Sequence, residues 1–544
     1  MRRGSRSNNG FVGLNLKQKM SQGVVTPNKD IQKSESTWNA WIRPSNWLSM
    51  PDMTAGDQRI ALLAAVAGPT GNTANASSLF ALSVSGCTYT VDWGNGFTQS
   101  YPSNTVASYG LYYDELPAST TVKPDFAFQL TGFNFEEFNG YRQALVQVYP
   151  TVAGTTFAGF HLRPTQVNAG QNARFPNLAY RTAEIAPDWI SCKFASPTVT
   201  SAVFNSSSTL KDVEIVGSTG ITNAGSMFRS CYQLKKVSGT EWCKNALSFQ
   251  DTFGFCRNLT NVPLLDTSSA TNMSFMFQYC SSLRTVPQFD TRNVTTTASM
   301  FGNCVQLTDL PLLNTQSVQN AASMFSNCRS LKTIPKFNTK NMTNMNSMFD
   351  ACTLLQSVPD LDYSSVSDPS FMFRNCTSLE EVNVSSMTQA SSAVSTFSNC
   401  HKLKKVILPS NNGFINTNSM FSNCRSLQSV SMDMLFCNDM STMFQNCHSL
   451  TDVNLINLAA ASLISNIFQG CTNIQRIRLN GFVQGPLNLG GSSSVTRSLS
   501  PDALNELYES LGTPSTTKTL TVTGNWGFES SNRSIATAKG WLVV

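Results

Sequence analysis

A cysteine recurs about every 24 residues through the middle of this 544-residue chain, and this spacing is its most restrictive sequence feature. Eleven cysteines form the series, which runs from Cys231 to Cys471 with spacings of 24 residues apart from one of 25 and one of 23. Phe stands three residues before each cysteine, and Leu, or Ile in the last copy, stands three residues after it. A fixed period of this length indicates a solenoid, in which each coil covers the hydrophobic face of its neighbours.

Stacked coils of this kind place like residues on like residues inside the solenoid. The central coils are expected to contribute these ladder residues: Phe277, Cys280, Leu283, Phe301, Cys304, Leu307, Phe325, Cys328, Leu331, Phe349, Cys352 and Leu355. Within a unit, Ser-Met-Phe-x-x-Cys has the spacing of one or two helical turns, and Leu-x-x-Val-Pro suits a short strand that ends at its proline. The Asp/Asn-Thr that follows suits a turn or a helix cap. Leu210 and Val213 mark a partial first coil without its Phe and Cys.

The repeat gives the cysteines a structural role. A buried cysteine behaves as a small hydrophobic residue, so we expect free thiols inside the stack. Neighbouring rungs would lie close enough to cross-link, which leaves disulfides open as an alternative. The chain contains no Cys-x-x-Cys pair, and one cysteine per coil makes a line and not the tetrahedron that zinc requires. We therefore expect no metal and no cofactor.

The unit Asp-Thr-x-x-Val-Thr-x-Met-x-x-Met-Phe-x-x-Cys-x-x-Leu resembles the BspA-type leucine-rich repeats, also called DUF285. Residues 338–358 match it closely, and the resemblance covers about residues 210–480. It implies a curved solenoid of parallel strands, usually found in surface adhesins, and it implies no catalytic residues.

A second resemblance lies before the repeats. Alternating apolar residues lead into the turn Gly94-Asn95-Gly96, which is a hairpin signal. The stretch Val-Asp-Trp-Gly-Asn-Gly over residues 91–96 resembles the Val-Asp-Trp-Gly-Asp-Gly signature of PKD-like, immunoglobulin-type β-sandwiches, with Asn95 where that family has Asp. We expect Trp93 in the core, with sugar stacking as the alternative. We expect Asp92 and Asn95 in the turn, with a cation contact as the alternative.

These patterns predict a mainly β protein with short helices, divided into five segments. They are a basic N-terminal arm and anchoring segment over residues 1–58, an immunoglobulin-like sandwich over 59–165, a linker and N-terminal solenoid cap over 166–209, the solenoid over 210–485 and a C-terminal cap over 486–544. In the last segment, Ser500 and Pro501 predict the start of a helix that ends near Gly512, followed by a strand over 519–522.

Charge is concentrated in the first 44 residues, which hold eight basic and two acidic side chains and therefore carry +6, the net charge of the whole chain. A basic arm on a neutral body suggests a docking tail, with a solvated tail as the alternative. We expect Arg2, Arg3, Arg6, Lys17 and Lys19 to anchor the protein to a particle, together with residues 35–55.

Several function classes are disfavoured. The chain has three histidines and lacks a Gly-rich phosphate loop, a His-Glu-x-x-His motif and a nucleophile elbow, so we expect no enzyme. His401 and His448 are expected on the surface. Acidic residues are scattered through the repeats, which disfavours a β-helix lyase or glycosidase. Balanced charge outside the arm disfavours nucleic-acid binding. No apolar stretch is long enough for membrane insertion or for a signal peptide.

The arm, the sandwich motif and the repeats together resemble virion proteins of tailed phages of the marine or cyanophage type. The resemblance implies a non-enzymatic virion structural protein, assembled in the host cytoplasm and extracellular on the mature particle. We expect the arm to bind other virion proteins, the protein to form a homo-oligomer on the particle, and the solenoid, as a fibre or adhesin, to meet a host-surface glycan or protein. The first alternative is an architectural decoration of capsid, neck or tail. The second is a bacterial surface adhesin, which the missing signal peptide and wall anchor disfavour.

Overall fold

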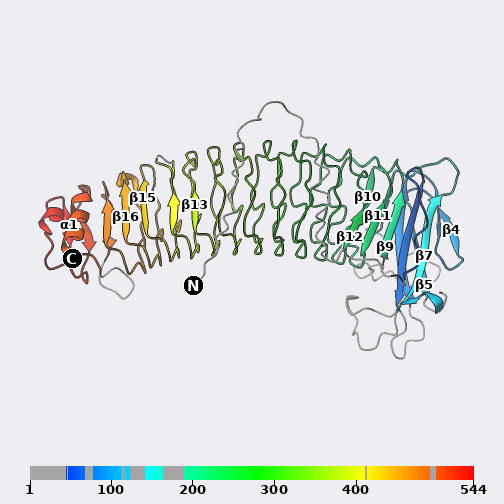
Figure 1. Ribbon diagram of the computed structural model, residues 1–544, viewed down its shortest axis with the longest axis horizontal. Coiled ribbons are helices and arrows are strands. Elements are labelled where there is room, and N and C mark those ends of the chain that lie inside the picture. The colour runs from blue at the N-terminus through cyan, green and yellow to red at the C-terminus, as the bar shows by residue number, and fades with distance from the viewer. Residues whose placement is uncertain are drawn as a thin grey trace, which may run out of the picture. The chain divides into compact units, whose positions relative to one another are not determined.

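The computed structural model describes residues 45, 47–67, 77–112, 116, 118–122, 141–162, 189–410, 413–489 and 498–544. This part of the chain is mainly β, with few and short helices, as the sequence predicts. A two-sheet N-terminal domain leads into stacked 24-residue coils, and the coils lead into a small C-terminal cap (Figure 1). Within the described residues, no helix is both long enough and apolar enough to span a lipid bilayer.

Two sheets build the N-terminal domain. The larger contains, in spatial order, β12 (Lys236–Ser238), β11 (Asp212–Ile215), β9 (Trp189–Ala195), β1 (Arg59–Ala67), β7 (Tyr141–Pro150), β3 (Tyr89–Asp92) and β4 (Thr98–Tyr101), with β6 (Thr121–Val122) beside β7. The smaller contains β10 (Ser201–Val203), β8 (Gly159–His161), β2 (Ser77–Ser85) and β5 (Val106–Tyr112). A short 3-10 helix, η3 (Ala118–Thr120), precedes β6. Buried residues of both sheets, such as Leu62, Leu82 and Val146, belong to one core.

The predicted hairpin is present between β3 and β4, and its signature residues have the structural roles expected of them. The Asp92 carboxylate accepts a hydrogen bond from the Gly94 N–H at 2.9 Å, and the Asn95 amide oxygen accepts one from the Phe97 N–H at 3.2 Å. Trp93 is fully buried and stacks on Tyr109, with 5.4 Å between ring centroids. Gly94 is required here, because its φ is +77° and a Cβ would lie 2.6 Å from the Leu145 carbonyl oxygen.

The N-terminal domain and the solenoid share one continuous sheet. Strand β9 pairs antiparallel with β1 of the domain on one side and parallel with β11 of the first coil on the other. Residues 189–203, predicted as linker and cap, therefore supply β9 to the larger sheet and β10 to the smaller one. This part of the segment is a cap and not a linker, because pairing with β9 satisfies the backbone groups that the first coil would otherwise expose.

Proline decides where the solenoid has regular strands. Strands form in the coils in which the repeat Val or Ile is followed by a residue with an N–H, namely β11, β12, β13 (Glu381–Asn383), β14 (Lys405–Ile407), β15 (Ser429–Asp433), β16 (Asp452–Ile456) and β17 (Arg476–Leu479). The five coils between β12 and β13 have Pro263, Pro287, Pro311, Pro335 and Pro359 at that position, and no strand forms there (Figure 1). Proline cannot donate to the ladder. The predicted Val-Pro strand is thus wrong for these five coils.

The prediction of helical turns around Phe and Cys is also wrong. In the coil of Cys304, three i to i+3 hydrogen bonds follow one another, from Met300 N–H to Thr297 O, from Gly302 N–H to Ser299 O and from Cys304 N–H to Phe301 O, each 3.0 Å long. These are successive β-turns. Ser299 and Asn303 have φ values of 52° and 63°, which no right-handed helix accommodates.

The first coil is more complete than the sequence suggests. Phe204 stacks on Phe228 with 5.0 Å between centroids, and it lies three residues before the buried Ser207. The expectation of a first coil without its Phe is therefore wrong, since Phe204 and Ser207 fill the Phe and Cys positions above Leu210. A serine in place of cysteine hid this coil from the spacing pattern.

A helix and a three-stranded sheet close the other end. Helix α1 (Pro501–Ser510) starts as predicted, with the Ser500 hydroxyl accepting from the Ala503 N–H at 3.1 Å, and ends two residues before Gly512. Its Glu506 carboxylate lies 2.9 Å from Nε of Arg476 in the last coil. Strands β18 (Leu487–Asn488), β19 (Lys518–Thr521) and β20 (Trp541–Val543) are parallel, and β19 matches the predicted strand within one residue. Two further short helices are described, η6 (Leu458–Ala460) in the later coils and α2 (Ser534–Thr537) in the cap.

Candidate binding surface

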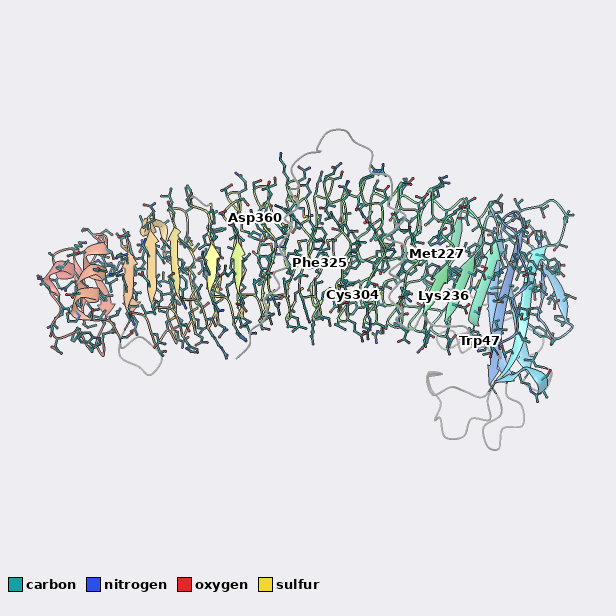
Figure 2. The ribbon with its side chains drawn as sticks, in the orientation of Figure 1. Trp47, Met227, Lys236, Cys304, Phe325 and Asp360 are labelled. Atoms are coloured by element: carbon teal, nitrogen blue, oxygen red, sulfur yellow. The ribbon has the colours of Figure 1, made fainter. Side chains whose placement is uncertain are left out.

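The predicted ladder residues all lie in the interior of the stack. Each of the twelve is 0% exposed: Phe277, Cys280, Leu283, Phe301, Cys304, Leu307, Phe325, Cys328, Leu331, Phe349, Cys352 and Leu355. The rings of successive coils are nearly parallel, for example those of Phe301 and Phe325 at 5.6 Å and 4°. Figure 2 shows Phe325 and Cys304 within the stack. The ladders therefore hold the coils together and offer no surface to a ligand.

Every repeat cysteine donates a hydrogen bond to the coil before it. Each of the eleven thiols, from Cys231 to Cys471, lies 2.8–3.1 Å from the carbonyl oxygen of the stacked Phe in the preceding coil. For Cys231, the first of the series, that acceptor is Phe204. All fifteen cysteines of the chain are free and buried, including the eleven repeat cysteines for which free thiols were expected. Burial raises the pKa of the Cys231 thiol to about 12 and that of Cys437 to about 11. Such thiols are poor nucleophiles and poor metal ligands.

The histidine and acidic side chains that a catalytic or metal site would need are dispersed. His448 is exposed and its Nδ1 lies 2.9 Å from the Gly470 carbonyl oxygen, while His401 is half-buried. Glu380 forms an ion pair with Lys404 at 2.9 Å. Across the residues that the structure describes, no three His, Cys, Asp or Glu side chains gather closely enough to hold a metal ion.

The outer face of the stack carries polar residues in register. Asn occupies the position before the repeat cysteine in six coils, and the amide of Asn399 donates to Asn375 at 2.9 Å while that of Asn423 donates to Asn399 at 2.9 Å. The threonines of the Asp/Asn-Thr pairs are buried and donate to the next coil, as Thr291 does to the Asn314 carbonyl at 2.9 Å. The Asp and Asn of these pairs cap turns, as Asp290 does for the N–H of Arg292 at 3.2 Å, which agrees with the expected turn role. These rows orient outward side chains at fixed intervals.

A groove of about 680 Å³ lies where the coil pattern changes. Its lining includes the exposed side chains of Lys336, Lys340, Asp360 and Asp362. At this point of the stack, Asn383 stands where the five preceding coils have proline, strand β13 forms, and the Val384 side chain is fully buried. Asn383 donates to the Asp360 carboxylate at 3.0 Å. Figure 2 labels Asp360 in the stack.

The groove suits recognition better than acid catalysis. The Ser364 hydroxyl and N–H hold the pKa of Asp362 below its ordinary value, which favours the ionised carboxylate. An ionised carboxylate beside lysines is a hydrogen-bond acceptor, whereas a general acid needs a raised pKa. Nothing in the sequence pattern singled this groove out, although the loss of proline after Val382 was a visible signal.

The predicted anchoring residues Arg2, Arg3, Arg6, Lys17 and Lys19 lie outside the described residues, so their contacts remain predictions. Most of residues 35–55 also lies outside them. Residues 45 and 47–55 of that segment are described. Among them, Trp47 is 6% exposed, and Lys211 Nζ lies 5.8 Å from its ring centroid (Figure 2).

Comparison with known families gives the repeats a classification. The family described as "Mycoplasma protein of unknown function, DUF285" matches residues 198–310, 246–357 and 306–412, and the "BspA type Leucine rich repeat region" matches residues 394–485. The chain carries DUF285 and BspA-type leucine-rich repeats. The family predicted for the repeats is confirmed, whereas the PKD-like and phage resemblances stay predictions.

Three of the solved structures that this chain is similar to are described as leucine-rich or leucine-rich repeat proteins. A leucine-rich cell surface protein of Faecalibacterium prausnitzii is 20% identical over 59% of this chain and 89% of that one, with a TM-score of 0.29. A leucine-rich repeat protein of Eubacterium ventriosum is 16% identical over 50% and 79%, with a TM-score of 0.30, and one of Leptospira interrogans is 12% identical over 64% and 96%, with a TM-score of 0.21. Such TM-scores support no conclusion about function. No curated protein sequence matches the chain.

Proposed function

We propose that this protein is a non-enzymatic binding protein that uses the outer face of its repeat stack for attachment. The burial of the repeat thiols and phenyl rings in hydrogen-bonded ladders carries the proposal, because it leaves the outward rows and the groove as the surfaces a partner can reach. Repeat stacks offer extended binding surfaces of this kind. The BspA-type match supports the same role, since the repeats resemble those of surface adhesins.

Within this role, we favour a virion structural protein of a tailed phage, homo-oligomeric on the particle and facing a host-surface glycan or protein. The arm, which carries the whole net charge of +6 in its first 44 residues, would bind other virion proteins. The test is mass spectrometry of purified particles from a phage whose genome encodes this chain. If purified particles lack the protein, the virion hypothesis is wrong and a bacterial surface adhesin becomes the better hypothesis.

The arm has its own test. A chain without residues 1–44 should fold and stay soluble, because the described sheets and coils begin after them, yet it should no longer join the particle. Incorporation at the level of the full chain would contradict anchoring by the arm.

Attachment is tested with the purified full chain. It should bind susceptible cells and reduce infection when added before the phage, whereas bovine serum albumin at the same concentration should do neither. If the chain binds cells but does not reduce infection, it adheres to a surface other than the phage receptor. If it neither binds cells nor reduces infection, the attachment function is wrong.

A second function, an architectural decoration of capsid, neck or tail, is favoured by one observation. Leu435 and Phe436, adjacent in a turn of the later coils, are 49% and 55% exposed. Exposed apolar side chains of this size often mark protein contacts. If deletion of the protein disrupts particles while the purified chain does not bind cells, decoration is the better reading.

A further inference from the structure

The position before each repeat cysteine has a positive φ in every coil. Asn, Ser, Ala or Gly fills it in nine of the eleven, with Asn in six. Two adjoining coils differ: Phe255 and Tyr279 occupy it with φ values of 64° and 61°. The left-handed region costs an L-residue roughly 1–2 kcal/mol, and Asn reduces that cost through local hydrogen bonds. Backbone conformation therefore does not explain these two aromatic residues.

The two rings form an outward stack. Their centroids are 4.6 Å apart and their planes differ by 14°. Aromatic pairing of this kind contributes about 0.5–1.5 kcal/mol, which offsets part of the backbone cost. Tyr279 nevertheless stays 39% exposed, on a face where Asn would be the easier choice. A strained aromatic pair with one exposed ring points to a role in binding.

Arginines accompany the rings. The Arg229 guanidinium lies 5.2 Å from the Phe255 centroid, and that of Arg257 lies 5.3 Å from the centroid of Tyr232, which is 40% exposed. Three consecutive coils thus bring three aromatic rings and two guanidinium groups together on one surface. We call Arg229, Tyr232, Phe255, Arg257 and Tyr279 the aromatic platform.

The two arginines differ in their partners. Arg229 forms an ion pair with Asp251, whose other carboxylate oxygen packs against Gly254. Arg257 has no carboxylate partner in the described part of the chain. The platform therefore carries one uncompensated positive charge beside exposed rings.

We propose that the aromatic platform binds an acidic polysaccharide, with sugar rings packed against Tyr279 and Tyr232 and a sugar carboxylate paired with Arg257. A pyranose presents an apolar C–H face that suits an aromatic ring, and a guanidinium binds a carboxylate with two parallel hydrogen bonds. The uncompensated charge favours an anionic polymer over a neutral one. This inference rests on the proposed attachment function and names its ligand class.

Calorimetric titration of the full chain with polygalacturonate tests the site. The variants are Tyr279→Asn, which installs the residue that six other coils use, and Arg257→Ser, which installs the residue found at the same position in the next coil, Ser281. Both changes follow the repeat, so both variants should fold. Each should weaken binding at least about tenfold, the loss expected for one charged or stacking contact. Ala351→Asn, at the position of Tyr279 but three coils away, should bind like the wild type.

Three further probes complete the test. Dextran should not bind measurably, and equal affinity for it would overturn the role of charge. Poly-glutamate that binds as tightly as polygalacturonate would overturn the sugar in favour of an acidic protein. Unchanged polygalacturonate binding by Tyr279→Asn and Arg257→Ser, or no binding by the wild type, would overturn the site. In the last case, cell adhesion by the same preparation would show that the attachment function stands without this ligand.

Discussion

The Cys304 thiol donates a hydrogen bond to the carbonyl oxygen of Phe277, 3.1 Å away in the preceding coil. The same oxygen accepts the N–H of Cys280 from its own coil at 3.0 Å. Each such carbonyl thus receives one bond within its coil and one from the next, which uses both lone pairs of a buried acceptor. This explains why the position holds cysteine, a small hydrophobic residue that also has a weak donor.

Replacing Cys304 with alanine should lower the free energy of unfolding by about 1–2 kcal/mol, since it removes a buried sulfur and leaves one hydrogen bond unmade. Urea denaturation followed by circular dichroism measures the change. Gln306→Ala, an exposed position two residues away, should shift stability by less than about 0.5 kcal/mol. A neutral Cys304→Ala would show that the sulfur contact does not stabilise the stack.

Thiol-specific labelling should be blocked in the native protein. All fifteen cysteines are buried, and a pKa near 12, as for Cys231, leaves very little thiolate at pH 8. A chromogenic aromatic disulfide reagent should therefore titrate almost no thiols in buffer and about fifteen in guanidinium chloride. Rapid native labelling, or intermolecular disulfides in the untreated protein, would contradict the buried ladder.

Stability should fall at alkaline pH. Burial raises the pKa of the ladder thiol Cys231, and of Cys437, a buried thiol outside the ladder, above the ordinary value of 9.0. At high pH the native state therefore holds protons that the unfolded state has lost. Stability decreases with pH wherever the native state binds more protons. The contribution is complete below pH 9 and is lost as pH rises through the folded values, about 11 for Cys437 and 12 for Cys231. Urea denaturation midpoints measured from pH 7 to 10.5 should stay level up to about pH 9 and decline above it. A midpoint that rises above pH 9 would contradict the predicted direction of the pH dependence.

Ala351→Asn should stabilise the protein by about 1 kcal/mol. Ala351 has a φ of 59°, which alanine tolerates poorly and asparagine accepts more readily. The reverse change, Asn399→Ala, should cost about 1–2 kcal/mol, because it adds that strain at φ 63° and breaks amide bonds to Asn375 and Asn423. Thermal denaturation compares both variants with the wild type. Equal melting temperatures for the two variants would contradict a stabilising role of the asparagine row.

Phe204→Ala should loosen the N-terminal domain together with the first coils. The Phe204 ring stacks on Phe228 at 5.0 Å and meets Phe160 of the smaller sheet edge-on at 5.2 Å. Loss of a buried phenyl ring costs about 3–5 kcal/mol. Hydrogen exchange should become faster in both β9 and β11. Phe301→Ala, in the middle of the stack, should cost a similar amount yet leave exchange in β9 unchanged; faster exchange there would indicate that the whole protein opens as one unit.

The sequence was sufficient to predict the parts of the fold that repeat. Eleven copies of one spacing identified the coils, the twelve central ladder residues and the burial of the cysteines, because a stacking unit must reuse the same interior positions. Ser500 and Pro501 likewise predicted the start of α1, since capping is a local interaction. The spacing also suggested helical turns, which was wrong, because a period of three or four residues does not distinguish a helix from successive β-turns.

The candidate sites were less accessible to sequence reasoning. The groove near Asp360 and the aromatic platform are made by residues from neighbouring coils, 20 or more positions apart in the chain, as Asn383 and Asp360 are. Their residue types are ordinary when read one coil at a time. Only the stacking of coils brings Phe255 against Tyr279, or Arg229 over Phe255.

By itself, then, the sequence determined the repeat, its family and its interior, because hydrophobic periodicity and helix capping depend on residues that lie close together in the chain. The tertiary structure decided what breaks that regularity. It placed β9 between β1 and β11, so that the N-terminal domain caps the solenoid, and it filled the first coil with Phe204 and Ser207. These outcomes depend on pairing between distant segments, and the free energy of such pairing is not carried by either segment alone.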